Sequence, residues 1–346
     1  LCGDFAVELK PRGITAQEKS GRCWLFAALN MLREVAADNL GLSDLQLSQN
    51  YLSFYDKLEK SNNFLEMVIE NAGEPLDSRM MWYINYGIGD GGYWDMAADL
   101  VKKYGVVPQY VMPESYQSNH TEKFRKLQNS ILHRDAAELR KIIAEGRDPY
   151  PRKDEMMAEI YKALCIVFGE PVTRFTYEYR DEKGEFHAIR GITPQEFYEK
   201  YVGLDLDEYI GVSNSLTGKT PLGQYYEFHY MGNMADSNVH ALNVTMDELQ
   251  ELVIKQLTDG EPVWFGCDAG AFGDRQMGIW DPDSFDYEGL IGGAKIAMDK
   301  SEGLEYLESS ATHAMLLIGV NFDKDGAPDR WKIENSWGKD VGKNGY

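Results

Sequence analysis

One cysteine in this sequence stands where a nucleophile could be activated. Cys23 falls in the first turn of a predicted helix, which Ser20 can cap and which ends before Gly41. A cysteine at a helix N-terminus meets partial positive charge and aligned N–H groups, which lower its pKa and favour the thiolate. We therefore interpret Cys23 as a nucleophile. The other cysteines have no such setting and are expected to be inert buried residues: Cys2, Cys165 and Cys267.

A thiolate nucleophile needs a base, and His313 is the histidine with a suitable setting. It begins a predicted strand, 313–320, which a turn-rich stretch joins to a second strand, 330–335, as in an antiparallel hairpin. The hairpin can place Asn335 beside His313, where its amide oxygen would accept the Nδ1 proton and fix the imidazole tautomer. Trp337 follows and could shield that hydrogen bond from water. The remaining histidines are expected to be structural: His120, His133, His187, His229 and His240.

Acyl transfer also requires donors for the negative charge that develops on the carbonyl oxygen. Gln17 lies six residues before Cys23, and its side-chain NH2 together with the Cys23 backbone N–H are the candidates. Gly91 and Gly92 would let a substrate backbone pair with the chain in extended form. An ordinary tight turn is the alternative interpretation of these two glycines.

The elements that must position these residues change in character along the chain. The helix that begins near Cys23 is apolar nearly all round, which is typical of a helix buried at the centre of a domain. Further helices are expected at Met96–Tyr104, from Thr121 to about Glu145, at Met156–Phe168 and at Thr193–Tyr201, and further strands at Val172–Tyr179 and Val263–Cys267. A helix-rich front thus precedes a strand-rich back, which indicates an α+β fold.

The composition narrows the class of protein. A chain of 346 residues suffices for two domains or for one two-lobed enzyme with a large insertion. The net charge of −21 repels phosphate backbones and argues against nucleic-acid binding. No apolar run approaches the roughly 20 residues of a membrane span. The four cysteines form no CxxC pair, so neither a zinc site nor a disulfide framework is indicated, and a reducing compartment is expected.

The motifs that carry these residues resemble the papain superfamily of cysteine peptidases. The resemblance rests on Gln17, the run from Ser20 to Trp24, His313-Ala314 and the run from Asn335 to Gly338. Two departures stand out: Ser20 replaces the cysteine of the disulfide in secreted members, and His313 lies 290 residues after Cys23 instead of about 130–150.

With these two departures and several further matching segments, the sequence resembles one branch of the superfamily in particular, the bleomycin hydrolase and aminopeptidase C family. The matching segments are 89–96, 103–108, 242–244 with 246–249, and 266–268. The resemblance implies a papain-like two-lobed fold with a central catalytic helix, a β-barrel-like lobe and a large, mainly helical insertion. The expected parts are a helical lobe at 1–108, the insertion at 109–230 and a β-rich lobe carrying His313 and Asn335 at 231–346.

The resemblance also implies a function. It is that of a cytoplasmic aminopeptidase acting on peptides, without metal or organic cofactor, in a homohexameric barrel whose sites face an internal channel. The substrate would be held at Gly91, Gly92 and Trp337. In the family a C-terminal tail fills part of the cleft and limits attack to the N-terminal end, whereas this sequence stops eleven residues after Asn335. A papain-like endopeptidase is therefore the alternative, and a non-enzymatic binding protein of the same fold is the third hypothesis.

Overall fold

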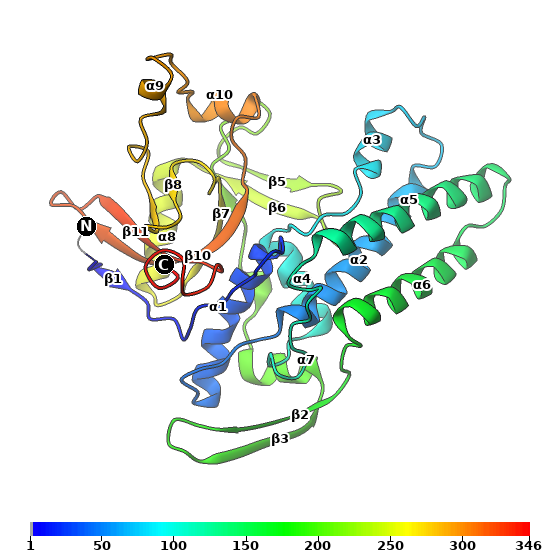
Figure 1. Cartoon of the computed structure of the whole chain (residues 1–346), viewed down its shortest axis with the longest axis horizontal. Coiled ribbons are helices and arrows are strands. Elements are labelled where there is room, and N and C mark those ends of the chain that lie inside the picture. Colours follow the sequence, from blue (N-terminus) through cyan, green and yellow to red (C-terminus); the bar gives the residue numbers. More distant parts are fainter. Residues whose placement is uncertain (1–2) are drawn as a thin grey trace.

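The computed structural model describes residues 3–346, with one central helix between a helical layer and a β-sheet (Figure 1). The central helix, α1 (Cys23–Leu40), packs against α2 (Gln49–Glu70) and α4 (Trp94–Tyr104). It also packs against β7 (Val263–Cys267) and β10 (His313–Phe322) of the sheet. The predicted inert Cys2 lies outside the described residues.

The helix α1 is buried on almost every face, as its sequence predicts. From Trp24 to Arg33 every residue is buried, and only a few positions near the end are partly open. The helix stops at Gly41, whose left-handed backbone (φ 65°, ψ 40°) lets its N–H bond the Ala37 and Asp38 carbonyls. The expected cap by Ser20 is wrong. Arg22 occupies the N-cap position, and the Ser20 hydroxyl instead donates to the Gln17 carbonyl at 2.5 Å.

Three long helices form the helical layer and lie side by side (Figure 1). They are α2, α5 (Glu122–Ala144) and α6 (Tyr150–Phe168), with the short α3 (Arg79–Asn85) at one end. The predicted helices at α4, α5 and α6 are confirmed, although α6 begins six residues earlier than expected. The sequence pattern missed α2, because its buried residues include polar ones such as Asp56, Lys57 and Lys60, which break the apolar periodicity.

A β-hairpin and a second small sheet follow α6. Strands β2 (Phe175–Arg180) and β3 (Phe186–Ile192) pair antiparallel and project from the body of the molecule (Figure 1). The helix α7 (Pro194–Phe197), capped by Thr193, continues into a π-helical turn at Tyr198–Val202, and a 3-10 turn follows at Leu206–Glu208. Three strands then form a sheet with β6 in the middle: β4 (Val212–Ser213), β5 (Gln224–Phe228) and β6 (Val239–Asn243).

The sheet that faces α1 is built around β10. Strand β11 (Pro328–Glu334) pairs along one edge of β10, and β7 and β1 (Val7–Glu8) pair with it on the other, all antiparallel. Leu316 and Ile318 of β10 pack on α1, whereas Leu317 and Val320 pack on α8 (Met246–Thr258), with a bulge at 317–319 between them. The sheet is thus covered by one helix on each face.

The predicted strands β7, β10 and β11 and the hairpin between the last two are confirmed. Short elements fill the stretch between β7 and β10: β8 (Gly273–Asp274), β9 (Ile279–Trp280), α9 (Tyr287–Leu290) and α10 (Lys300–Glu305). Across residues 3–346, no helix has both the length and the apolar character needed to traverse a lipid bilayer. The fold is mixed α/β, and the division at residues 108 and 230 stays a prediction.

Candidate active site

The first residue of α1 meets the first residues of β10. The backbone N–H of Ala314 lies 3.5 Å from the sulfur of Cys23 and points to it as a donor. Because Ala314 follows His313 directly, the contact brings the two sequence-predicted groups together from 290 residues apart. The pairing of β10 with β7, which sets His313 opposite Cys267, holds this end of the strand in place.

The imidazole of His313 is held by Asn335. Its Nε2 lies 2.8 Å from the Asn335 side-chain oxygen, which also accepts a hydrogen bond from the Ser336 backbone N–H at 2.8 Å. The second bond fixes which end of the amide is oxygen, so Nε2 must carry the proton and Nδ1 is left as the basic nitrogen. The expectation that Asn335 meets Nδ1 is therefore wrong. Asn335 lies one residue beyond β11 and reaches Nε2, the ring nitrogen farther from the backbone.

Trp337 covers the imidazole. Its ring stacks on that of His313 with centroids 4.8 Å apart and planes 21° apart. The guanidinium of Arg275 lies in turn 3.8 Å from the centroid of the Trp337 ring. Burial lowers the pKa of His313, the hydrogen bond to Asn335 opposes that shift, and the charge of Arg275 adds to it.

The thiol of Cys23 does not follow the helix-terminus expectation. Burial raises the pKa of Cys23, although the backbone N–H groups of Ala314, Trp24 and Cys23 itself oppose the shift. The expected depression of this pKa is wrong for the thiol taken singly, because desolvation outweighs the N–H groups. Since burial disfavours a charge on Cys23 and on His313 alike, the charged form that this site favours is the pair, thiolate with imidazolium, in which each stabilises the other.

Gln17 bridges the loop before Cys23 and the segment after Asn335. Its backbone N–H donates to the Ser336 carbonyl at 2.8 Å, and its side-chain oxygen accepts from the Ser336 hydroxyl at 2.6 Å. One N–H of its amide donates to the Ser20 carbonyl at 2.6 Å. The side chain is buried, so Gln17 is not a solvated loop residue. Sequence reasoning did not single out Ser336, the residue that fixes Gln17.

The loop of residues 89–92 lies against Trp24. The Trp24 indole N–H donates to the Asp90 carbonyl at 2.7 Å, and a Cβ on Gly92 would lie 2.7 Å from the Trp24 ring. Glycine is therefore required at 92 for close approach. A Cβ on Gly91 would meet open space. Neither glycine has a positive φ, so a left-handed turn is not the reason for the pair.

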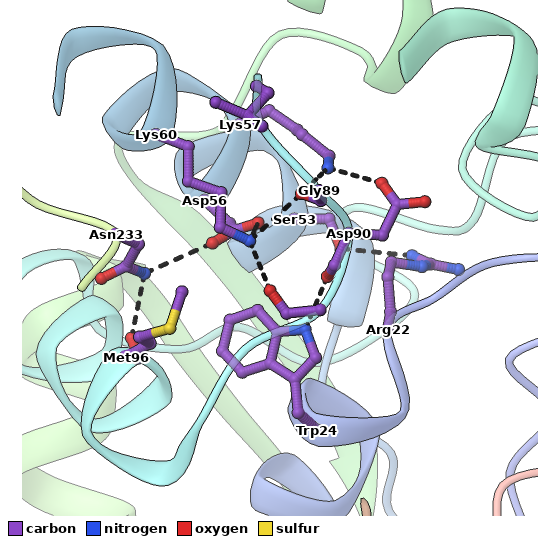
Figure 2. A network of polar contacts seen from close by, with 12 residues as sticks. Arg22, Trp24, Ser53, Asp56, Lys57, Lys60, Gly89, Asp90, Met96 and Asn233 are labelled. Carbon is purple, nitrogen blue, oxygen red and sulfur yellow. Dashed lines mark hydrogen bonds and ion pairs between the residues drawn. The ribbon is translucent and has the colours of Figure 1, made fainter. Parts of the chain in front are cut away.

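Two buried lysines of α2, which sequence reasoning missed, hold this loop from the side of α2 (Figure 2). The ammonium of Lys60 reaches the Gly91 carbonyl at 2.7 Å, the Gly89 carbonyl at 3.3 Å and the Asp56 carboxylate at 2.9 Å. Burial lowers the pKa of Lys60, and the charge of Asp56 opposes that shift. The three acceptors match the three protons of the ammonium form. No sequence signal marks such lysines, because a lysine on a helix is ordinarily exposed.

The second lysine, Lys57, pairs with Asp90 at 2.5 Å and bonds the Gly89 carbonyl at 2.8 Å. Burial opposes ionisation of Asp90, but Lys57 and the Thr121 hydroxyl outweigh it and lower the pKa of Asp90 to about 2. A Cβ on Gly21 would lie 2.8 Å from the Asp90 Cβ. The loop before the nucleophile and the glycine loop are thus in direct contact.

The residue before the nucleophile is also held by charge. Arg22 is buried, forms an ion pair with Glu114 at 2.9 Å and donates to the hydroxyls of Ser20 at 2.9 Å and Ser53 at 3.3 Å. Figure 2 shows Arg22 and Trp24, from the start of α1, converging with Asp90 of the glycine loop. At Ser20, where secreted relatives of the resembled superfamily have a disulfide, this chain thus uses a polar network.

Behind the site, a buried ion pair joins β11 to α1. The Glu334 carboxylate lies 3.0 Å from the guanidinium of Arg33 and accepts from the Asn30 amide at 2.9 Å. Burial raises the pKa of Glu334 to about 7, against the opposing charge of Arg33. Because Glu334 precedes Asn335 and both of its partners lie on α1, the pair links the residue that orients His313 to the helix that carries Cys23.

Comparison with known proteins gives one consistent result. The sequence model of the Peptidase C1-like family matches residues 3–346. The chain is 45% identical over 344 residues to an aminopeptidase C of Listeria monocytogenes, a match that covers 99% of this chain and 78% of that protein. It is 41% identical over 347 residues to an aminopeptidase C of Streptococcus thermophilus, with the same two coverages. The crystal structure of PepW from Lactobacillus rhamnosis HN001 is similar with a TM-score of 0.97 and 42% identity, over 100% of this chain and 78% of that one.

Proposed function

Because this chain belongs to the Peptidase C1-like family and is a cysteine aminopeptidase, we propose that Cys23, His313 and Asn335 are its catalytic residues. The observation that carries the proposal is the chain of contacts from Asn335 to the His313 Nε2 at 2.8 Å and from Ala314 to the Cys23 sulfur at 3.5 Å. It supports an imidazole whose basic Nδ1 is free to serve the sulfur.

The first half of the reaction makes an acyl-enzyme. The Nδ1 of His313 takes the thiol proton, and the Cys23 sulfur attacks the scissile carbonyl carbon. The developing oxyanion is held by the Cys23 backbone N–H and by the Gln17 amide N–H that Ser20 leaves unused. The His313 imidazolium then gives its proton to the leaving amine as the C–N bond breaks, which leaves the acyl group on the sulfur.

The second half releases the acyl group. His313, again neutral, takes a proton from water, whose oxygen attacks the thioester carbon. The C–S bond breaks and the sulfur recovers the proton from the imidazolium. Asn335 holds the ring in one tautomer throughout, and Trp337 keeps water from their hydrogen bond.

The substrate lies across the site in one direction. Its acyl side pairs with the loop at Gly91 and Gly92, which rests on Trp24. Its leaving side extends over Trp337, because His313 must reach the leaving nitrogen and Trp337 covers His313.

The same proposal includes three further features. They are the division into a helical lobe, an insertion and a β-rich lobe, the assembly into a homohexamer, and a cytoplasmic location. Sedimentation of the purified protein tests the hexamer.

Two assays test the chemistry. Iodoacetamide should modify Cys23 faster than Cys165 and Cys267, because the pKa of each of these two is raised by burial, that of Cys267 to about 11, with no basic partner to offset the shift. The advantage should vanish in His313→Ala. A Cys23 that labels no faster than Cys165 in the wild type would favour the non-enzymatic binding protein.

The second assay compares a peptide with a free N-terminus and its N-acetylated form. An aminopeptidase cleaves only the free peptide, whereas the alternative, a papain-like endopeptidase, cleaves both. The relatives named aminopeptidase C support the first outcome.

A further inference from the structure

An exposed cation lies on the leaving-group side of the site. The Arg275 guanidinium lies 3.8 Å from the centre of the Trp337 ring, which is stacked on His313. Arg275 belongs to the turn after β8, and its carbonyl accepts a hydrogen bond from the Gly342 N–H at 3.2 Å. Both the side chain and the backbone of Arg275 are therefore held beside the catalytic imidazole.

This guanidinium has no carboxylate partner among residues 3–346 within the 4 Å of an ion pair. The neighbouring Asp274 turns its carboxylate away, to the backbone N–H groups of Gln276 and Met277 at 3.0 Å each. A chain with a net charge of −21 offers acidic partners in excess, so an arginine without one is available to a ligand. A guanidinium presents paired N–H donors that match the two oxygens of a carboxylate.

Three buried cations near the site are already engaged. Lys57, Lys60 and Arg22 are buried and paired with Asp90, Asp56 and Glu114, respectively. They hold loops and do not face substrate. Arg275 differs from these three in being exposed and in having no carboxylate partner among residues 3–346, so its donors are left for a bound peptide.

The direction of the substrate says which carboxylate could reach Arg275. In the residue that follows the scissile bond, the main-chain carbonyl carbon lies about 2.5 Å from the leaving nitrogen by standard bond lengths. In a dipeptide that carbon is the terminal carboxylate. An aspartate or glutamate at the same position carries a carboxylate only one or two bonds farther out. Either would pass over Trp337, toward the cation that rests on it.

We propose that Arg275 binds a carboxylate of the residue after the scissile bond, so that the enzyme favours short peptides ending there or peptides with an acidic residue there. The inference rests on the proposed function and names the substrate class on its leaving-group side. The anionic surface of the protein repels such substrates in general, and one local cation beside His313 offsets that repulsion where cleavage occurs.

The test uses matched substrates on the full chain. One pair is alanyl-alanine and its C-terminal amide, which isolates the terminal carboxylate. A second pair, the amides of alanyl-glutamate and alanyl-glutamine, isolates the side-chain carboxylate. The coumarinylamide of alanine, which has no carboxylate, reports the basal reaction. Each rate is measured at the pH optimum of the variant, because Arg275 also lowers the pKa of His313.

Arg275→Gln should lower kcat/KM for the carboxylate member of at least one pair about 10-fold, as for the loss of one charge-assisted hydrogen bond. The neutral member and the coumarinylamide should be unaffected, and Arg275→Lys should restore part of the loss. Lys324→Gln, which removes an exposed charge in the turn between β10 and β11, is the matched control and should change none of these ratios. Thermal unfolding of each variant confirms that it is folded.

The outcomes separate the two proposals. An Arg275→Gln enzyme that loses activity equally on both members of each pair, or on neither, overturns the role of Arg275 while the cleaved coumarinylamide upholds the aminopeptidase. A wild-type protein that cleaves none of the substrates refutes the proposed function, and the role of Arg275 with it.

Discussion

Replacing Lys60 by methionine should destabilise the protein strongly, because the change strands a buried carboxylate. The wild-type ammonium is the only cation within ion-pair distance of Asp56 among the described residues. After Lys60→Met, the carboxylate keeps one side-chain hydrogen-bond donor, the Asn233 amide at 3.3 Å. The carbonyls of Gly89 and Gly91 lose a donor as well.

The expected magnitude follows from these contacts. Removing one partner of a buried ion pair costs about 3–5 kcal/mol in the free energy of unfolding, since the remaining charge is uncompensated. In the double variant Asp56→Asn with Lys60→Met that charge is gone, while the oxygen of the introduced amide can still accept the bond from Asn233. We expect the double variant to recover at least about 1 kcal/mol relative to Lys60→Met alone, the signature of coupled neighbours.

Urea unfolding of the wild type, both single variants and the double variant measures this coupling. Hydrogen exchange adds a local readout: amides of the peptide spanning residues 88–93 should exchange faster in Lys60→Met, because the loop has lost its anchor. Ser130→Ala, on the exposed side of α5, is a control for a surface change. Two results would contradict the role of Lys60 as the charged anchor of the loop. One is a Lys60→Met variant that unfolds at the same urea concentration as the wild type. The other is a double variant whose loss in the free energy of unfolding is the sum of the losses in the two single variants.

Three further predictions concern the site. Asn335→Ala should lower kcat/KM about 10–100-fold, the value of one hydrogen bond in the charged state, with binding of a substrate-like inhibitor retained. Gln17→Ala should lower kcat about 10²–10³-fold, because one oxyanion donor is lost. The rate at which iodoacetamide alkylates Cys23 should not change, since alkylation forms no oxyanion. Against the effect of burial, the ion pair with Lys57 lowers the pKa of Asp90 to about 2, so this pair stabilises the fold above about pH 4, by about 2 kcal/mol, and the stabilisation is lost as the pH falls toward 2. The stability difference between wild type and Asp90→Asn, from urea unfolding across that range, should shrink accordingly; a constant difference would contradict it.

The parts that could be predicted from sequence are those in which local pattern and chemistry agree. The helix from Cys23 to Gly41 and the strands at His313 and before Asn335 have clear apolar patterns and clear ends, so their existence and their convergence were predictable. The types of residue at their ends, a cysteine, a histidine and an asparagine, indicated the thiol chemistry. The tautomer was not predictable, because it depends on which ring nitrogen Asn335 reaches from one residue beyond β11.

The parts that escaped prediction are held by buried charge. The helix α2 has a buried face that includes Asp56, Lys57 and Lys60, and a pattern search treats such residues as exposed. The pKa of Cys23 escaped for a related reason. The helix terminus is visible in sequence, but the desolvation that outweighs it depends on packing from β10.

The same buried charges explain how the site holds its shape without a covalent link between the nucleophile loop and the glycine loop. A disulfide fixes two loops through one bond, whereas here Lys57 and Lys60 fix the glycine loop to α2 and Arg22 fixes the nucleophile loop to Glu114. Such a network depends on every partner being present, because its cations are buried and costly when unpaired. It follows that reducing agents should leave this geometry intact, whereas acid, which neutralises the carboxylates, should loosen the two loops together. Within residues 3–346, the two loops of the active site are therefore held by ionised carboxylates and not by a disulfide.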